Sequence, residues 1–158
     1  MTLTASRAVV RKRSFPVVLT MFLLGFLGVS AAAGSLALLF DLGGGQPTIS
    51  WMEDFPLVDS YVVPGLVLGI GFGLGSILTT YGMIRRPRWS WLEGLERVTG
   101  HHWSWLATIL IGAGQVAWIG LEVAYLPGLS WLQILYGPLG LALVLLAMLP
   151  SVKEYLKA

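Results

Sequence analysis

The chain has 158 residues, the length of one domain, yet 56% of them are hydrophobic and only 11% are charged. Soluble globular domains carry about 25% charged residues, so this composition excludes an ordinary soluble protein and predicts a membrane protein. Because there is no cysteine, disulfides, thiolate metal sites and thiol nucleophiles are excluded as well. The net charge of +2 comes from short basic blocks beside apolar runs, a placement that indicates membrane orientation and not nucleic-acid binding.

Long uncharged runs predict four membrane-spanning helices, since a helix of about 20 apolar residues crosses a bilayer. The expected spans cover about 15–40, 61–84, 103–125 and 131–149. We separate the last two at Pro127 and Gly128, with Ser130 as the cap of the next helix, and Pro150 ends the fourth span before a short tail. The predicted fold is all-α, a single membrane domain over residues 1–158 formed by a four-helix bundle of two helical hairpins.

The first span has a second interpretation. Arg11, Lys12 and Arg13 precede it, and Ala31-Ala32-Ala33 resembles the cleavage site of a secretory signal. The apolar run continues to Phe40, well past a signal-peptide apolar region of about 7 to 15 residues. We therefore expect a retained helix.

The ten basic residues predict the orientation. They fall before the first span, after the second and after the fourth: Arg7, Arg11, Lys12, Arg13; Arg85, Arg86, Arg88, Arg97; Lys153 and Lys157. By the positive-inside rule, both termini and the 85–102 connection are cytoplasmic and the 41–59 loop is outside, in a bacterial inner (plasma) membrane.

The cytoplasmic connection contains Ser90-Trp91-Leu92-Glu93, a capping-box pattern, and Gly100 can end the short amphipathic helix that follows. We expect this helix to lie in the membrane interface. Ser130-Trp131-Leu132-Gln133 repeats the pattern. Cap chemistry explains the recurrence, and an ancestral duplication of hairpins remains an alternative.

The second span is rich in glycine at positions that allow close approach of a neighbouring helix. These helix-packing candidates are Gly65, Gly69, Gly71, Gly73 and Gly75. With no preceding strand and no following Lys-Ser/Thr pair, they do not predict a nucleotide loop.

Glu122 is the most informative single residue, because a carboxylate within a span often marks a functional site. Gln115 and Trp118 share its helix face, and Asp59 and Tyr61 begin the second span at the same membrane depth. We expect these five residues to line a polar cleft that binds a cation or a headgroup amine. The alternative is that Glu122 only reaches the outer interface while Gln115 bonds a neighbouring helix.

Nothing predicts catalysis, a metal or a cofactor. His101 and His102 are adjacent, so on a helix they diverge by about 100° and do not chelate as an i, i+4 pair does. No pattern typical of a hydrolase or zinc enzyme is present. We expect a protein that is not an enzyme.

Three stretches carry a resemblance to a known group: residues 55–66 (FPLVDSYVVPGL), 118–122 (WIGLE) and 130–136 (SWLQILY). In order and spacing the chain resembles widespread, uncharacterised bacterial four-helix integral membrane proteins, from about Asp41 onward. The resemblance implies the topology and no activity. The longer basic connection from Arg85 to His102 departs from that pattern.

The sequence thus favours a noncatalytic membrane protein, either an accessory subunit or a protein that binds a lipid or small ligand at the outer leaflet. Its expected partners are membrane lipids and a membrane protein or second copy of the chain. The alternative is a small transporter or channel acting as an oligomer, because four helices with few buried polar groups do not enclose a hydrated path alone.

Overall fold

The computed structural model describes residues 13–40, 62–125 and 128–158. Within these ranges every named element is a helix. Four helical segments are long and apolar enough to cross a membrane: α1 (Phe15–Phe40), the second span (Val62–Arg85), α6 (Trp103–Tyr125) and α7 (Trp131–Met148). Their bounds agree with the predicted spans to within one residue, so the all-α, four-helix prediction is confirmed.

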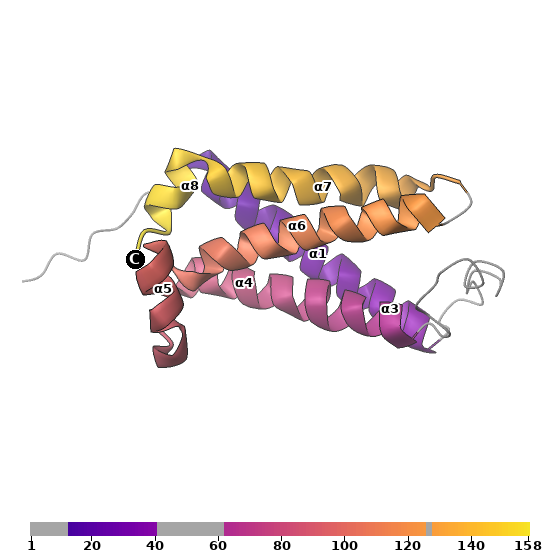
Figure 1. The fold of residues 1–158 in the computed structure, drawn as a ribbon, viewed down its shortest axis with the longest axis horizontal. Coiled ribbons are helices and arrows are strands. Elements are labelled where there is room, and N and C mark those ends of the chain that lie inside the picture. Colours follow the sequence, from indigo (N-terminus) through magenta and orange to yellow (C-terminus); the bar gives the residue numbers. More distant parts are fainter. Residues whose placement is uncertain (1–12, 41–61, 126–127) are drawn as a thin grey trace, which may run out of the picture.

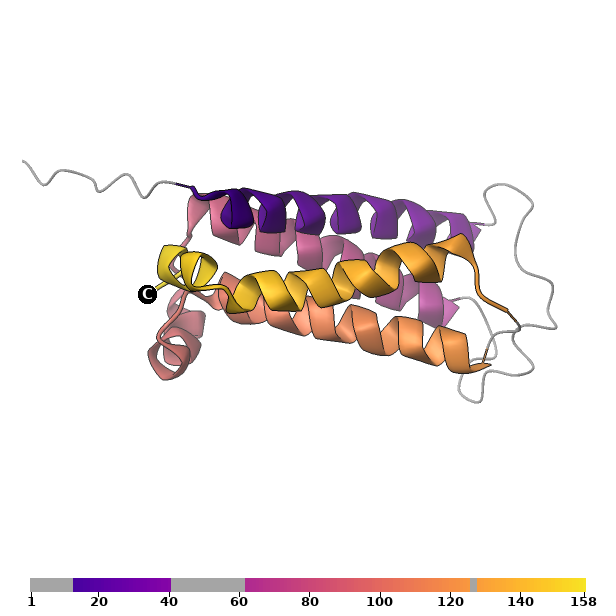
Figure 2. The same ribbon diagram turned by 90° about the horizontal axis from the view of Figure 1, so that it is seen from above.

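The four spans form an elongated bundle (Figure 1). We call the end that holds the start of α1 and the C-terminus the terminal end, and the other the far end. Figure 2, turned by 90°, shows the same bundle with the long helices running side by side between these ends. All basic residues of the described ranges lie in or next to the terminal end: Arg13, Arg85, Arg86, Arg88, Arg97, Lys153 and Lys157.

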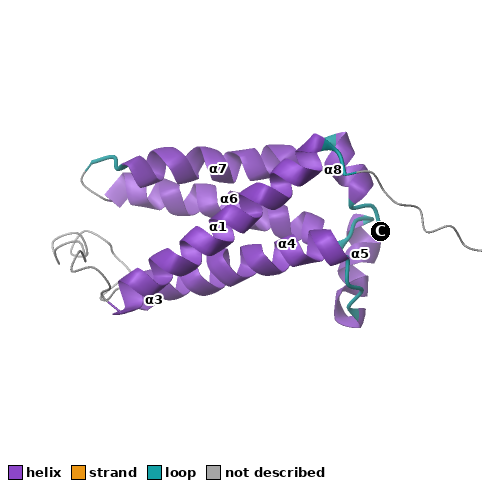
Figure 3. Ribbon diagram, turned by 180° about the vertical axis from the view of Figure 1, so that it is seen from behind, coloured by secondary structure: helices purple, strands orange, loops and turns teal. Residues whose placement is uncertain are grey.

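The helices pair as the two predicted hairpins. α1 packs along the second span, and α6 packs along α7. The hairpins meet through α4 against α6 and through α1 against α7, and they diverge toward the far end (Figures 1 and 3). The far end of each hairpin therefore stands apart from the other hairpin.

The second span is not a uniform α-helix. It consists of α3 (Val62–Leu66), a π-helix η1 (Val67–Leu74) and α4 (Gly75–Arg85). At the end of η1 the Gly75 N–H donates to the Ile70 carbonyl, five residues earlier. This wider turn rotates the following residues relative to a regular α-helix, and no pattern in the sequence predicted it.

Three glycines of the second span lie against α1. A Cβ at Gly65 would stand 2.8 Å from the Leu39 side chain, and one at Gly73 would stand 3.2 Å from the Ala32 backbone nitrogen. A Cβ at Gly69 would collide with the Ser35 hydroxyl. That hydroxyl donates a 2.7 Å hydrogen bond to the Gly65 carbonyl, so α1 and the second span are joined by a polar contact as well as by close packing.

The other two predicted packing glycines do not belong to this face. An added Cβ at Gly71 would have no atom within 4 Å, and one at Gly75 would have ordinary contacts at 3.7 and 3.8 Å. Residues two apart on a helix point in nearly opposite directions, so Gly71 turns away from α1 when Gly69 and Gly73 face it. The glycine face thus comprises three residues and not five.

The 85–102 connection contains a 3₁₀ turn η2 (Ser90–Leu92) and the short helix α5 (Glu93–Thr99). Gly100 ends α5 with φ +67°, as predicted. The capping box predicted at Ser90 is wrong, because Ser90 is itself in the 3₁₀ turn and Trp89 precedes it in an extended conformation without a side-chain cap. Trp89 is held there by stacking on Trp103, with ring centroids 5.0 Å apart.

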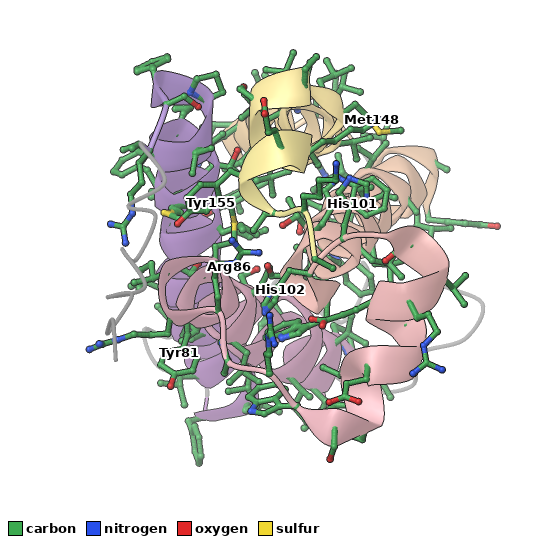
Figure 4. The ribbon with its side chains drawn as sticks, turned by 90° about the vertical axis from the view of Figure 1, so that its left-hand side faces the viewer. Tyr81, Arg86, His101, His102, Met148 and Tyr155 are labelled. Carbon is green, nitrogen blue, oxygen red and sulfur yellow. The ribbon has the colours of Figure 1, made fainter. Side chains whose placement is uncertain are left out.

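The segment after Pro150 is not a simple tail. Residues Pro150–Tyr155 form α8, which follows Leu149 at the terminal end. The side chains of Val152 and Leu156 are fully buried, and the Tyr155 hydroxyl donates to the Met83 carbonyl at 3.1 Å. Figure 4 views this end and shows Tyr155 and Arg86 close together. The C-terminal segment therefore contributes to the core.

Candidate functional site

One face of α6 carries the polar residues that the sequence placed on a common face, and in the structure this face lies toward α7. Gln115 is 3% exposed and packs on α7, since a Cβ added at Gly140 would stand 2.9 Å from the Gln115 Cβ. Glu122 lies two turns farther along the same face and is half-buried. The polar stripe of α6 therefore lies along the α6–α7 contact.

Two donors hold the Glu122 carboxylate. The Trp118 indole Nε1 donates to Glu122 Oε1 at 2.5 Å, a bond between residues four apart on one helix. The Gln133 side chain, near the start of α7, also lies within interaction range of the carboxylate. Glu122 is thus held by its own helix and by the next one.

Gln133 is oriented by the cap of α7. The Ser130 backbone N–H donates to Gln133 Oε1 at 2.5 Å, so the side-chain amide is left to donate to Glu122. The capping pattern Ser130 to Gln133 was recognised in the sequence, but its link to Glu122 was not. The signal was present: the connection between the two predicted spans is short, so Glu122 and Gln133 are expected at one depth on neighbouring helices.

The three described members of the predicted cleft, Gln115, Trp118 and Glu122, do not form one hydrogen-bonded cluster. Seven residues of helix separate Gln115 from Glu122 by about 10 Å along the axis, and the two side chains share no hydrogen bond. Gln115 Oε1 is buried and has no hydrogen-bond partner among the described residues. The expected contributors from the second span, Asp59 and Tyr61, lie outside the described residues.

The described partners of Glu122 belong to α6 and α7, whereas the partners predicted from the second span lie outside the described residues. Shared membrane depth led us to place the second span beside Glu122, but both partners of the carboxylate belong to the α6–α7 hairpin. The start of α3 and the end of α6 diverge in Figures 1 and 3. Depth alone does not decide which helices are neighbours.

No cation pairs with Glu122 in the part of the chain that the structure describes. The ion pair found there joins His102 and Glu96, at the opposite end of α6. Trp118 and Gln133 are both uncharged donors, and a carboxylate has about four acceptor positions. The arrangement leaves further acceptor positions of the carboxyl group, fixed in direction, for a donor at the far end.

A second polar cluster lies at the terminal end. The buried His102 ring has Nδ1 2.9 Å from the Ser104 hydroxyl and Nε2 3.2 Å from the Pro87 carbonyl. Its Nε2 is also 3.7 Å from Glu96 Oε1, and Figure 4 shows His102 between the end of α4 and α5. Burial lowers the pKa of His102, only partly opposed by the Pro87 carbonyl and Glu96.

Sequence reasoning missed this cluster because it tested the two histidines only as metal ligands. They diverge, as expected: His101 turns to the Thr99 carbonyl at 2.7 Å and stacks on Trp105. Within the described ranges no three His, Asp or Glu side chains gather in a way that could hold a metal ion. The contacts of His102 come from α5 and the 85–90 segment, which spacing along α6 does not reveal.

No protein-family model, curated protein or solved structure matches the chain. The resemblance to bacterial four-helix membrane proteins therefore stays a prediction, and the duplication of hairpins stays an alternative.

Proposed function

We propose that the protein is a noncatalytic membrane protein that binds a lipid or small amphipathic ligand through an ammonium group at the far end of the α6–α7 hairpin. The observation that carries this proposal is the Glu122 carboxylate, held by Trp118 and Gln133 and lacking a cationic partner among the described residues. A carboxylate in a span is costly unless something compensates it. A ligand ammonium supplies the missing charge.

Binding fits these surroundings better than catalysis does. Catalysis that pairs a general acid with a general base needs two titrating groups near the reacting atoms. Among the described residues, the side chains placed at Glu122 are an indole and an amide, and neither exchanges a proton at ordinary pH. The cluster is built to hold a charge in place.

The depth of Glu122 favours a headgroup. The carboxylate lies one turn before the end of α6 at Tyr125, and Gln133 lies in the first turn of α7. This is where a spanning helix meets the headgroup region. With the terminal end in the cytoplasm of a bacterium, as the positive-inside rule proposes, the ligand belongs to the outer leaflet of the inner membrane.

The experiment compares lipids that remain bound after gentle detergent extraction. Protein reconstituted with equal amounts of phosphatidylethanolamine and phosphatidylcholine is analysed by native mass spectrometry. We expect preferential retention of the primary amine lipid, and Glu122→Gln should reduce it about tenfold, the equivalent of one charge-assisted hydrogen bond. The matched control is Glu93→Gln, which removes an exposed carboxylate at the other end.

Equal retention of the amine lipid by the parent and Glu122→Gln would refute the proposal. The same spectra report the mass of the assembly. The transporter alternative instead predicts a discrete oligomer that moves a cation across liposomes, with a flux abolished by Glu122→Gln and no preference between the two lipids.

A further inference from the structure

The short helix α5 exposes its apolar face and turns polar side chains toward the bundle. Trp91, just before α5, is 76% exposed, and Val98 is 87% exposed. Leu95 lies between them at helical spacing and is also exposed. A helix that packs on a bundle in water normally buries such a stripe. Here the stripe is left uncovered by the described chain.

The opposite side of α5 is fixed by hydrogen bonds. Glu96 Oε1 accepts from the Trp103 backbone N–H at 3.1 Å and lies 3.7 Å from His102 Nε2. The Thr99 hydroxyl lies 3.1 Å from the His101 carbonyl. Because these contacts tie one face of α5 to the start of α6, the helix does not rotate to bury its apolar face.

A stack of tryptophans fixes the approach to the helix. Trp89 lies between Trp103 and Trp91, with ring centroids 5.0 Å and 5.8 Å apart and interplanar angles of 13° and 10°. The Trp103 indole donates to the Pro87 carbonyl at 3.3 Å. Trp91 is therefore the exposed end of a rigid aromatic stack.

The direction of α5 suits a membrane surface. It runs across the bundle axis at the terminal end and reaches past the side of the bundle in two perpendicular views (Figures 1 and 2). Spanning helices stand across the bilayer, so a helix crossing them at one end lies along its surface. Aromatic side chains are favoured at that depth.

The charges around α5 favour anionic lipid. Arg85, Arg88 and Arg97 are exposed next to or on the helix, whereas Glu93 is the exposed acid of α5. Glu96 faces the bundle and is engaged there. Basic side chains near an anionic bilayer surface each contribute about 1 kcal/mol of attraction.

We propose that α5, with Trp91, Leu95 and Val98 inserted and Arg88 and Arg97 at headgroup level, binds the anionic lipid surface of the bilayer around the terminal end. This surface is separate from the Glu122 site, and either proposal can fail without the other.

Because the chain contains no cysteine, a single introduced cysteine can be labelled at one known position. Val98→Cys and the control Glu93→Cys each receive an environment-sensitive fluorophore, and the full chain is reconstituted in phosphatidylcholine vesicles with or without phosphatidylglycerol. We expect spin-labelled lipid to quench the probe at position 98 strongly and that at 93 weakly. Energy transfer from position 98 to acceptor-labelled phosphatidylglycerol should exceed transfer to acceptor-labelled phosphatidylcholine.

The role of charge is tested by Arg88→Gln/Arg97→Gln in the Val98→Cys chain. Enrichment of phosphatidylglycerol should fall by about fivefold per arginine removed, and high salt should reduce it in the parent. Arg13→Gln/Lys153→Gln removes the same charge elsewhere and should leave it nearly unchanged. Melting curves check that each variant is folded.

Two results would overturn the proposal. Equal energy transfer to both lipids would remove the anionic specificity. The second result is a probe at position 98 that is shielded from water but is not quenched by spin-labelled lipid. If that probe becomes exposed when the protein is diluted in excess lipid, a second copy of the chain covers α5 and the bilayer does not.

Discussion

Gly112 of α6 and Gly140 of α7 face each other across the contact between the two helices. A Cβ on Gly112 would stand 2.7 Å from the Gly140 carbonyl oxygen, and one on Gly140 would stand 2.9 Å from the Gly112 carbonyl oxygen. Both obstacles are backbone, which cannot rotate away as a side chain can. The hairpin that carries Glu122 is therefore joined at a backbone-to-backbone contact.

Gly140→Ala should separate α6 from α7 and lower stability by about 1–3 kcal/mol, the usual range for overpacking. The control is Gly120→Ala, because an added Cβ there meets no atom within 4 Å. Because alanine loses less backbone entropy than glycine when a helix forms, the control should be as stable as the parent or more stable by up to about 1 kcal/mol. Thermal melting in detergent measures both, and equal melting temperatures would contradict the close contact.

Large side chains on the glycine face of the second span should also lower stability, and Gly71 offers a closely matched control. Gly69→Leu and Gly73→Leu should disturb packing on α1, because Ser35 and Ala32 occupy that space. Gly71→Leu adds the same side chain in the same π-helix, at a position where an added Cβ meets no described atom within 4 Å, and it should melt close to the parent. Size-exclusion profiles and melting temperatures distinguish them. Similar losses for all three variants would mean that leucine disturbs the π-helix itself.

The C-terminal segment should be part of the folding unit. Leu156 is fully buried, and its carbonyl accepts a 2.6 Å hydrogen bond from the His102 backbone N–H. Leu156→Ala should cost about 2–5 kcal/mol by leaving a cavity. Leu145→Ala removes the same atoms from a side chain that is 59% exposed on α7, and it should cost much less. Proteolysis near the terminal end and thermal melting report the difference.

Features that depend on residues close together in the chain could be predicted from the sequence, whereas contacts between distant segments could not. Uncharged runs gave the spans nearly to the residue, because hydrocarbon thickness sets helix length. The Trp118–Glu122 contact also followed from spacing, since both residues lie on one helix four positions apart.

The features that sequence reasoning missed join segments far apart in the chain. Gln133 reaches Glu122 across a hairpin, and His102 is enclosed by α5, Pro87 and, through its main chain, Leu156. The π-helix and the separation of α3 from α6 depend on how the hairpins pack. Hydropathy fixes the depth of each residue and not its neighbours.

Acidification should destabilise the terminal end through His102. Burial lowers the pKa of His102 below its ordinary value of about 6.5. The positive charges of Arg86 and Arg88 lower this pKa further, whereas the Glu96 carboxylate raises it. As the pH falls, His102 therefore binds a proton in the unfolded chain at a higher pH than in the folded chain. The contribution of neutral His102 to the free energy of unfolding is complete above about pH 6.5 and is lost as the pH drops toward the folded-state pKa. Melting temperatures across this window measure the effect.

His102→Gln should flatten that part of the pH profile, because an amide does not titrate there. His101→Gln is the matched control: it removes a neighbouring histidine that lies on Trp105, outside the Glu96 contact. A pH profile of His102→Gln that parallels the parent would exclude His102 as the source and assign the acid sensitivity to carboxylates.

The last prediction concerns orientation, which the positive-inside rule assigns from the basic residues at the terminal end. Because the chain has no cysteine, Leu129→Cys and Glu93→Cys can each be labelled at one position, at the far and terminal ends respectively. Both native side chains are exposed, so access depends on the side of the membrane and not on burial. In intact cells an impermeant maleimide should label position 129 at once and position 93 only after permeabilisation. The reverse pattern would place the Glu122 site in the inner leaflet and α5 outside, away from the anionic cytoplasmic surface that its arginines fit.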